Sequence, residues 1–247
     1  MANDNRHVIA VADPTELAQM AADRVIARIA ANAGRAAICL TGGSSPKQLY
    51  QLLATDACRD QIPWERVHWF IGDERFVPAY DPLNNMSVAR KIFLDHYAPA
   101  SNIHPIPTNT GNPNESAGCY ASELKSFYGA EELDPARPLF DLVLMGVGPD
   151  GHTASLFPGY PAVDETERWV VGVPTAHVAP LVARVTLTLP VLGSCHEMLF
   201  EAAGVDKRVI LTRVFDGEDL PANRACTTGE TIWLVDQAAL PENFRDR

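Results

Sequence analysis

The chain has 247 residues, which is long enough to bury a substantial core, and α/β folds of this size often form one domain. Its hydrophobic fraction of 47% and charged fraction of 21% are ordinary for a soluble globular protein and exclude long disordered stretches. The formal net charge of -11 argues against nucleic acid or an anionic membrane surface as the main partner, because both require basic patches. An anionic small molecule could still bind, but it would need a local cluster of cations and backbone N–H groups. From length and composition we expect a single domain over 1–247.

The N-terminal residues and the cysteines indicate the cellular compartment and the kinds of site to expect. The first residues, MANDNRHVIAV, are polar where a signal peptide needs an apolar core, and nowhere do about 18 apolar residues run together. We expect a cytoplasmic protein, either a monomer or a small homo-oligomer. The cysteines are odd in number, widely scattered and without a C-x-x-C pair, so the sequence predicts neither a disulfide framework nor a zinc site. We also expect no cofactor. They are Cys39, Cys58, Cys119, Cys195 and Cys226.

The first half of the chain alternates strand and helix without a linker or repeat. After a strand at 7–12, Asp13-Pro14-Thr15-Glu16 supplies a capping residue, a proline at the first helical position and a glutamate at the third, which predicts a helix to about Ala33. Ser45-Pro46-Lys47-Gln48 repeats this start signal. The other elements expected here are strands at 36–40 and 66–71 and a helix at 85–97.

The second half continues the alternation. Strands are expected at 140–146, 169–173, 185–189, 197–202 and 231–235, with a helix at about 207–215. Such alternation predicts an α/β fold with a mainly parallel sheet covered by helices.

Two of the predicted strands end in polar sets that suit an anion. Strand 36–40 runs into Thr41-Gly42-Gly43-Ser44-Ser45 directly before a helix, so free N–H groups and the positive helix end point at one spot, as a phosphate requires. The Walker pattern is absent, and an ordinary Gly-Ser turn is an equal alternative. Strand 66–71 runs into Gly72-Asp73-Glu74-Arg75, for which a solvated loop is also an equal alternative.

The third set is the most informative stretch of the chain, FDLVLMGVGPDGHTASLFPG at 140–159, in which His152 stands among glycines. Its apolar start predicts a strand buried on both faces. In parallel α/β sheets the ligand crevice lies outside the carboxyl ends of strands, and glycines let the backbone turn sharply and approach a ligand. An isolated histidine is more often structural than catalytic, so the functional interpretation of His152 depends on the surrounding motif.

Other site types fit this stretch less well. Its glycines satisfy G-x-G-x-x-G, but Pro149 interrupts the turn and the next strand lacks an acidic residue for a ribose, which argues against nicotinamide binding. A serine hydrolase is not indicated, because G-x-S-x-G does not occur. Asp150 and His152 could touch a metal together, but no H-E-x-x-H or second histidine pair accompanies them, so no metal site is predicted.

Four segments together resemble a known family. LTGGSSPKQLY, GDERFVP, MGVGPDGHTASLFPG and RVTLT occur in the order and approximate spacing of the bacterial 6-phosphogluconolactonases, and the resemblance spans nearly the whole chain. It implies a single-domain, Rossmann-like three-layer α/β/α sandwich, related to glucosamine-6-phosphate deaminases and ribose-5-phosphate isomerases, that hydrolyses 6-phosphogluconolactone without a metal. One departure is the pair Asn84-Asn85, where the family often has serine before the asparagine, so only Asn85 is carried over.

The residues themselves suit lactone hydrolysis. A δ-lactone is an activated ester, so water can attack it directly if a base removes a proton and the developing oxyanion is stabilised. His152 is the expected base, with Asp150 or Asp73 as its orienting partner. Arg75 and Arg184 are expected to bind anions, because a guanidinium donates two parallel hydrogen bonds while staying charged, and Arg184 is also a candidate for the oxyanion.

The remaining expected contacts concern the phosphate of a sugar-phosphate lactone. The glycine-serine turn should provide N–H groups, and the resemblance places a lysine at the start of the helix after Gly204-Val205-Asp206. The expected phosphate and substrate ligands besides the arginines are Gly42, Gly43, Ser44, Asn85 and Lys207.

Two other functions stay open at the level of the sequence. A related glucosamine-6-phosphate deaminase would carry an acidic residue before the proline of the histidine loop, where this chain has Phe157-Pro158. A non-catalytic sugar-phosphate sensor on a similar fold would be expected to carry a basic DNA-binding segment, which the sequence lacks.

Overall fold

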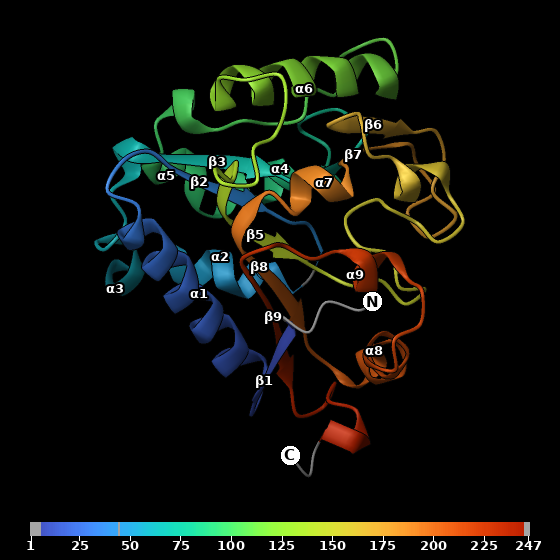
Figure 1. Ribbon diagram of the computed structural model, residues 1–247. Coiled ribbons are helices and arrows are strands. Elements are labelled where there is room, and N and C mark those ends of the chain that lie inside the picture. Colours follow the sequence, from blue (N-terminus) through green and yellow to red (C-terminus); the bar gives the residue numbers. More distant parts are fainter. Residues whose placement is uncertain (1–5, 44, 245–247) are drawn as a thin grey trace.

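The computed structural model describes residues 6–43 and 45–244, and its larger sheet has six parallel strands in the order β1-β9-β8-β5-β2-β3 (Figure 1). Each strand matches a predicted one to within one or two residues, so the α/β class and the parallel sheet are confirmed. The bounds are β1 (Arg6–Val11), β2 (Ala36–Leu40), β3 (Val67–Ile71), β5 (Phe140–Met145), β8 (Cys195–Ala202) and β9 (Glu230–Asp236).

Helices cover both faces of this sheet, as a three-layer sandwich requires. On one face, α1 (Pro14–Ala31) holds Glu197 of β8 through two arginines. On the other, α8 (Arg208–Phe215) packs Phe215 against Trp233 of β9, with ring centroids 5.4 Å apart. Figure 1 shows α1 and α2 (Pro46–Leu53) on the opposite side of the sheet from α8. Further short helices include α3 (Asp56–Arg59), α7 (Leu189–Leu192) and α9 (Pro221–Arg224).

The two predicted helix starts behave differently. The Asp13 side chain accepts hydrogen bonds from the N–H groups of Thr15 and Glu16, and Glu16 accepts one from the N–H of Ala12, so the capping arrangement expected for α1 is confirmed. At α2 the position is right, but Ser45 has helical backbone angles and its side chain caps nothing. Pro46 alone marks that start, and the N–H groups of this turn are left for another acceptor.

The predicted helix at 85–97 is one continuous helical stretch with a change of pitch. It consists of α4 (Asn85–Ala89), a π-helical turn (Arg90–Leu94) and α5 (Asp95–Tyr97). Phe93 of the π-helical turn packs against Tyr50 of α2 and Trp69 of β3, at centroid distances of 5.3 and 5.2 Å. This stretch therefore joins α1 and α2 on the same face of the sheet.

A 16-residue helix, α6 (Pro113–Tyr128), was missed by the sequence reasoning. Its start, Asn112-Pro113-Asn114-Glu115, has the same capping pattern as α1, and the Asn112 side chain accepts from the N–H groups of Asn114 and Glu115. The helix ends at Gly129, whose φ of 79° suits glycine. The signals were present in the sequence.

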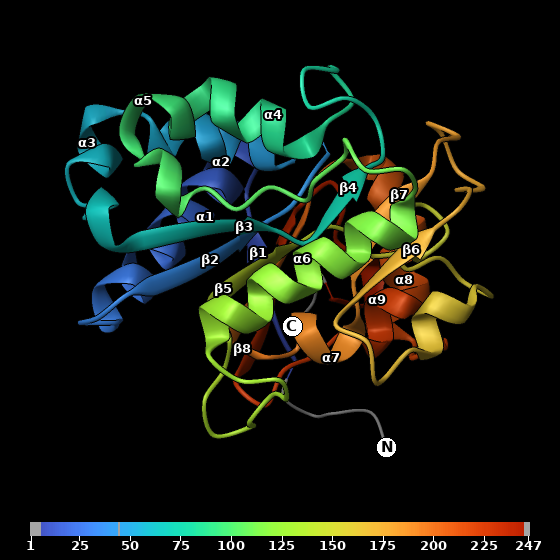
Figure 2. The same cartoon turned by 90° about the horizontal axis from the view of Figure 1, so that it is seen from above.

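A second, antiparallel sheet stands beside the mainly parallel sheet that was predicted, and the sequence did not indicate it. Here β4 (Asp73–Arg75), β7 (Arg184–Leu187) and β6 (Val170–Val173) pair antiparallel in the order β4-β7-β6. The segment after Gly72 is thus a short strand whose Glu74 is fully buried, and the solvated-loop alternative is wrong. Figure 2 shows α6 lying across this sheet, close to β6.

Chain order places a ligand crevice at the middle of the larger sheet. From β2 the chain continues outward to β3, whereas from β5 it continues outward the other way to β8 and β9. The neighbours β2 and β5 therefore form a topological switch point, where crevices open at the carboxyl ends of strands. No helix in the described part of the chain is long and apolar enough to cross a membrane.

Candidate active site

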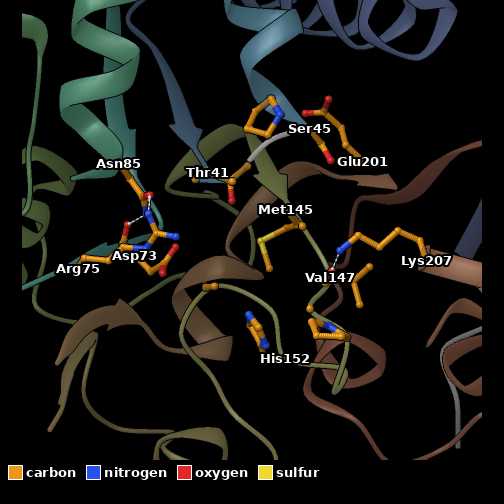
Figure 3. Close-up of a pocket in the computed structure, with 17 residues that line it drawn as sticks. Thr41, Ser45, Asp73, Arg75, Asn85, Met145, Val147, His152, Glu201 and Lys207 are labelled. Atoms are coloured by element: carbon orange, nitrogen blue, oxygen red, sulfur yellow. Dashed lines mark hydrogen bonds between the residues drawn. The ribbon is translucent and has the colours of Figure 1, made fainter. Parts of the chain in front are cut away.

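A cavity of about 240 Å³ lies at the carboxyl ends of β2, β5 and β8 and is bounded on one side by β4 (Figure 3). One water occupies roughly 30 Å³ of liquid, so this space fits a small organic molecule. The turn after β2, the residues of β4, the loop after β5 and the segment after β8 all contribute. The polar side chains that line it belong to Thr41, Ser45, Asp73, Arg75, Asn85, His152, Glu201 and Lys207.

The glycine turn after β2 borders the cavity, and the role of its N–H groups in binding an anion stays a prediction. Gly42 and Gly43 both line it, whereas Ser44 lies outside the described residues. The φ of Gly43 is 104°, a region that L side chains rarely adopt. Tyr50 of α2 fixes the start of the turn, because its hydroxyl donates to the Thr41 carbonyl at 2.7 Å and accepts from the Thr41 N–H at 3.2 Å.

Buried Glu74 organises the wall formed by β4. Its carboxylate accepts hydrogen bonds from the N–H groups of Arg75, Asn85 and Met86, at 2.6 to 2.9 Å, and so ties β4 to the first turn of α4. Burial raises the pKa of Glu74 to about 7, while these three bonds act to lower it.

Arg75 and Asn85 form a fixed pair in this wall. The guanidinium of Arg75 donates to Asn85 Oδ1 at 2.6 Å and to the Leu83 carbonyl at 2.9 Å. The Asn85 amide in turn donates to the backbone carbonyl of Asp73 at 3.0 Å. A Cβ on Gly42 would lie 2.1 Å from Asn85 Oδ1, so the absence of a side chain at Gly42 makes room for Asn85.

The acidic partner of His152 is Asp150. Their Nδ1 and Oδ1 atoms are 2.5 Å apart, whereas the Asp73 carboxylate accepts from the Ser155 hydroxyl at 2.5 Å. Asp150 also contacts a second ring, with His177 Nε2 at 2.8 Å from Oδ2. Burial alone would raise the pKa of Asp150, but its hydrogen bonds with the two histidines hold that pKa below its ordinary value.

The glycines after β5 make space for the histidine ring. A Cβ on Gly148 would lie 2.0 Å from His152 Cε1, so the ring occupies the place of a side chain there. The Gly148 N–H donates to the His152 carbonyl at 2.8 Å, and Gly151, with a φ of 89°, closes the turn. The prediction explained these glycines by close approach of a ligand, whereas at Gly148 the group that approaches is His152.

The segment after β8 contributes a cation and a carboxyl. Lys207, at the end of a 3-10 turn (Val205–Lys207), reaches the cavity and donates from Nζ to the Val147 carbonyl at 2.8 Å. Glu201 was missed by the sequence reasoning, because it stands inside an apolar strand pattern that gives no signal of a site. Only about 1% of Glu201 is exposed, and burial raises its pKa to about 8.

Arg184 lies outside the set of residues that line the cavity. It is buried and donates to the carbonyls of Val182 and Pro180, at 2.8 and 2.7 Å. In the β4–β7 pair it is in register with Arg75, so the two cationic side chains belong to neighbouring strands. The anion-binding role expected of Arg184 stays a prediction.

Among the described residues, no group of three or more His, Cys, Asp and Glu side chains is arranged to hold a metal ion. What the arrangement offers is a histidine oriented by a carboxylate, two cationic side chains and a turn that contains two glycines. Such a set can activate water and bind an anionic substrate.

Comparison with known proteins agrees with this description. The family described as glucosamine-6-phosphate isomerases/6-phosphogluconolactonase matches residues 12–233. A 6-phosphogluconolactonase of Synechocystis sp. is 40% identical over 225 residues, covering 89% of this chain and 89% of that protein. One of Streptomyces coelicolor is 36% identical over 248 residues, covering 96% and 94%.

The fold is shared with solved structures as well. The structure of 6-phosphogluconolactonase from Trypanosoma cruzi superposes with a TM-score of 0.82 at 28% identity, covering 95% of both chains. The expected resemblance and the α/β/α sandwich are therefore confirmed, and the chain belongs to the family of glucosamine-6-phosphate isomerases and 6-phosphogluconolactonases.

Proposed function

We propose that this chain is a carboxylic-ester hydrolase that opens 6-phospho-D-glucono-1,5-lactone to 6-phospho-D-gluconate in the oxidative pentose phosphate pathway. The observation that carries the proposal is the His152–Asp150 pair, 2.5 Å apart, at a cavity that also presents two cations and the Gly42-Gly43 turn. The 6-phosphogluconolactonases of Synechocystis sp. and Streptomyces coelicolor are 40% and 36% identical to this chain over most of its length.

His152 acts as the general base in this proposal. Asp150 engages Nδ1, which leaves Nε2 to remove a proton from water as the water oxygen bonds to the lactone carbonyl carbon. The carbonyl then re-forms, the bond from this carbon to the ring oxygen breaks, and His152 returns its proton to that oxygen. The step consumes one water and needs no covalent enzyme intermediate.

Cations and N–H groups hold the anionic parts of the substrate. Lys207 and the N–H of Gly43 bind the phosphate, and Arg75 with Asn85 supplies the second polar wall across the cavity (Figure 3). Arg184 acts from behind this wall, where its charge adds to the positive potential around Arg75. The substrate is a small sugar-phosphate lactone, and the reaction uses no cofactor or metal.

The deciding experiment compares lactone disappearance with and without protein, because the lactone also opens spontaneously. Ammonia release from glucosamine 6-phosphate is measured in parallel, since deaminases share the fold family. We expect faster lactone loss and no ammonia. Ammonia release without accelerated lactone loss would assign the chain to the other branch of the family.

A further inference from the structure

Asp150 is held through both of its carboxylate oxygens. Oδ1 lies 2.5 Å from Nδ1 of His152 and also accepts a hydrogen bond from the His152 backbone N–H at 3.2 Å. Oδ2 lies 2.8 Å from Nε2 of His177. Although burial alone would raise the pKa of Asp150, these hydrogen bonds hold it below its ordinary value, so the carboxylate is ionised and can only accept. Both ring nitrogens that face it therefore carry a proton.

His177 belongs to a different part of the molecule from the pair that it joins. Asp150 and His152 lie in the loop after β5 of the parallel sheet, whereas His177 lies between β6 and β7 of the antiparallel sheet. About 41% of the His177 side chain is exposed, and His177 is outside the set of residues that line the cavity. Its route to the reacting atoms is through Asp150.

The segment that carries His177 is fixed at two points. The His177 ring packs against Phe157 and Tyr160, at centroid distances of 5.1 and 5.3 Å, and Phe157 also packs against His152 at 4.9 Å. Further along this segment, the buried guanidinium of Arg184 donates to two of its backbone carbonyls. The ring of His177 is therefore in place before a substrate binds.

A second hydrogen bond to Asp150 matters because a carboxylate held at one oxygen is free to turn. The torsion about the Cβ–Cγ bond of an aspartate has broad energy wells, so a contact at Oδ1 alone does not fix the plane of the carboxylate. A second contact, at Oδ2, fixes it. Water can reach Asp150, whose side chain is about 23% exposed, but a mobile water does not give the hydrogen bond a fixed direction.

We propose that His177 is a positioning residue for the catalytic pair, which holds Oδ2 of Asp150 and thereby keeps Oδ1 directed at Nδ1 of His152. The ring of His152 then presents Nε2 to the attacking water in a fixed orientation. A general base is effective only when its reacting atom is held close to its productive place. The inference rests on the proposed function for the reaction that His177 serves, whereas the geometry itself needs no substrate.

Two substitutions separate the hydrogen bond of His177 from the packing of its ring. His177→Gln keeps an N–H donor, whereas His177→Phe keeps an aromatic ring against Phe157 and Tyr160 but donates nothing. Because a misplacement of about 1 Å can cost roughly 10²-fold in rate, we expect kcat of His177→Phe on 6-phosphogluconolactone to fall on the order of tenfold. KM should change little, since His177 lies outside the cavity. His177→Gln should restore most of the parent's kcat.

A proton resonance reports the same geometry without any substrate. The proton on Nδ1 of His152, held by Asp150, should give a downfield NMR signal that is assigned by its loss in His152→Asn. We expect this signal at the same shift in the parent and in His177→Gln. In His177→Phe it should broaden or move upfield, because the hydrogen bond to Asp150 is no longer fixed.

Two further variants separate positioning from a structural role. His196→Phe makes the same change at an exposed histidine of β8 that is outside the set of cavity-lining residues, and it should keep the parent's kcat and resonance. His177→Ala removes the ring as well as the donor and should lower kcat as much as His177→Phe does. The inference is overturned if His177→Phe and His177→Ala keep the parent's kcat, or if His177→Gln loses as much as they do.

Failure of the proposed function gives a different result. A parent protein that does not accelerate lactone opening contradicts the hydrolase, while the His152 resonance in His177→Phe still tests whether His177 positions the pair. A parent that hydrolyses the lactone, with His177→Phe equal to it in both kcat and resonance, contradicts the role of His177 alone.

Discussion

Asp150 contacts two imidazole rings, that of His152 through Oδ1 and that of His177 through Oδ2. The first contact bears on which ring nitrogen of His152 carries the proton. A carboxylate at Nδ1 keeps the proton on that nitrogen, so the lone pair of the ring is at Nε2. The sequence left open whether Asp150 or Asp73 orients the histidine. The structure favours Asp150, because its Oδ1 lies 2.5 Å from Nδ1 of His152, whereas the Asp73 carboxylate accepts a hydrogen bond from Ser155.

Replacing His152 with Asn should lower kcat by roughly 10²- to 10⁴-fold, the typical contribution of a positioned base. The fold should survive, because the ring is only partly buried, with about 19% of its side chain exposed. Lactone hydrolysis and circular dichroism on the same preparation check both parts. If His152→Asn remains active and His177→Gln does not, the base has been assigned to the wrong ring.

Lys207→Ala should raise KM by roughly 10- to 150-fold with a smaller fall in kcat, because a charge-assisted hydrogen bond contributes about 1.5 to 3 kcal/mol. Lys91→Ala is the charge-matched control, since Lys91 is exposed on the π-helical turn away from this cavity. On unphosphorylated gluconolactone Lys207→Ala and the parent should perform alike. An equal loss of activity on both substrates would mean that Lys207 supports the fold or the chemical step instead of binding the phosphate.

At the scale of elements, two glycines leave space for the side chains that line the site. The loop after β5 and the turn after β2 each lack a Cβ where His152 and Asn85 lie. The sequence predicted glycine-rich turns at both strand ends. It did not predict that Gly148 would face His152 of the same loop, or that Gly42 would face Asn85 from a distant part of the chain. Such a contact depends on how the loops fold back, which local sequence does not encode.

Gly148→Ala should therefore displace the His152 ring while preserving the fold. The new Cβ would lie 2.0 Å from Cε1 and 2.1 Å from Nδ1, and the end of a side chain can move where backbone cannot. Because a misplacement of about 1 Å can cost on the order of 10²-fold in rate, we expect kcat to fall at least tenfold with an unchanged melting temperature. Full activity would show that the ring relaxes without losing its catalytic position.

The contact between α6 and β6 gives a matched pair of glycine substitutions. A Cβ on Gly172 would lie 2.8 Å from the Pro113 carbonyl carbon and 2.9 Å from the Asn114 nitrogen, both backbone atoms, so Gly172→Ala should destabilise by about 1 to 3 kcal/mol. Gly118, exposed within α6, has nothing within 4 Å of such a Cβ. Gly118→Ala should stabilise by about 0.5 to 1 kcal/mol. Urea unfolding measures both, and changes of the same sign would contradict the packing argument.

At the scale of the whole molecule, one hydrophobic cluster includes residues of both sheets, among them Val170, Leu187 and Leu199. We propose on this basis that 1–247 acts as a single domain. The site combines both sheets, because Arg75 of β4, which pairs with β7, lines the cavity at the ends of β2 and β5.

The global stability of the parent should depend on pH through Glu201. Its pKa rises from 4.5 to about 8 on folding, so the folded state holds a proton that the unfolded state has released between these values. The contribution of this proton to the free energy of unfolding is fully present below about pH 4.5. It is lost as pH rises toward 8, by up to about 1.4 kcal/mol per pH unit. Glu201→Gln cannot titrate, so its stability relative to the parent should increase from pH 5 to pH 8 in urea unfolding. A constant difference would mean that the carboxyl is not held neutral by the fold.

Several parts of this protein could be predicted from the sequence because they depend on neighbouring residues. The six parallel strands follow from short apolar runs, and α1 follows from its cap. The motif around His152 follows strand β5, and the turn at Gly42-Gly43 follows strand β2. Because ligand crevices lie at the carboxyl ends of parallel strands, this was enough to place both at one crevice. The helix α6 had its own start signal and could have been found in the same way.

Only the tertiary structure decided the features that depend on residues distant in sequence. The pairing of β4 with β7 joins residues more than a hundred positions apart, and it makes a strand of a segment that resembled a loop. Asp150 rather than Asp73 contacts His152, and Arg184 donates hydrogen bonds to backbone carbonyls instead of lining the cavity. The buried carboxyl of Glu201 has no hydrogen-bond partner among the described residues. The physical reason is that strand pairing and side-chain burial are set by the packing of the whole chain, whereas capping and hydrophobic periodicity are set by residues a few positions apart.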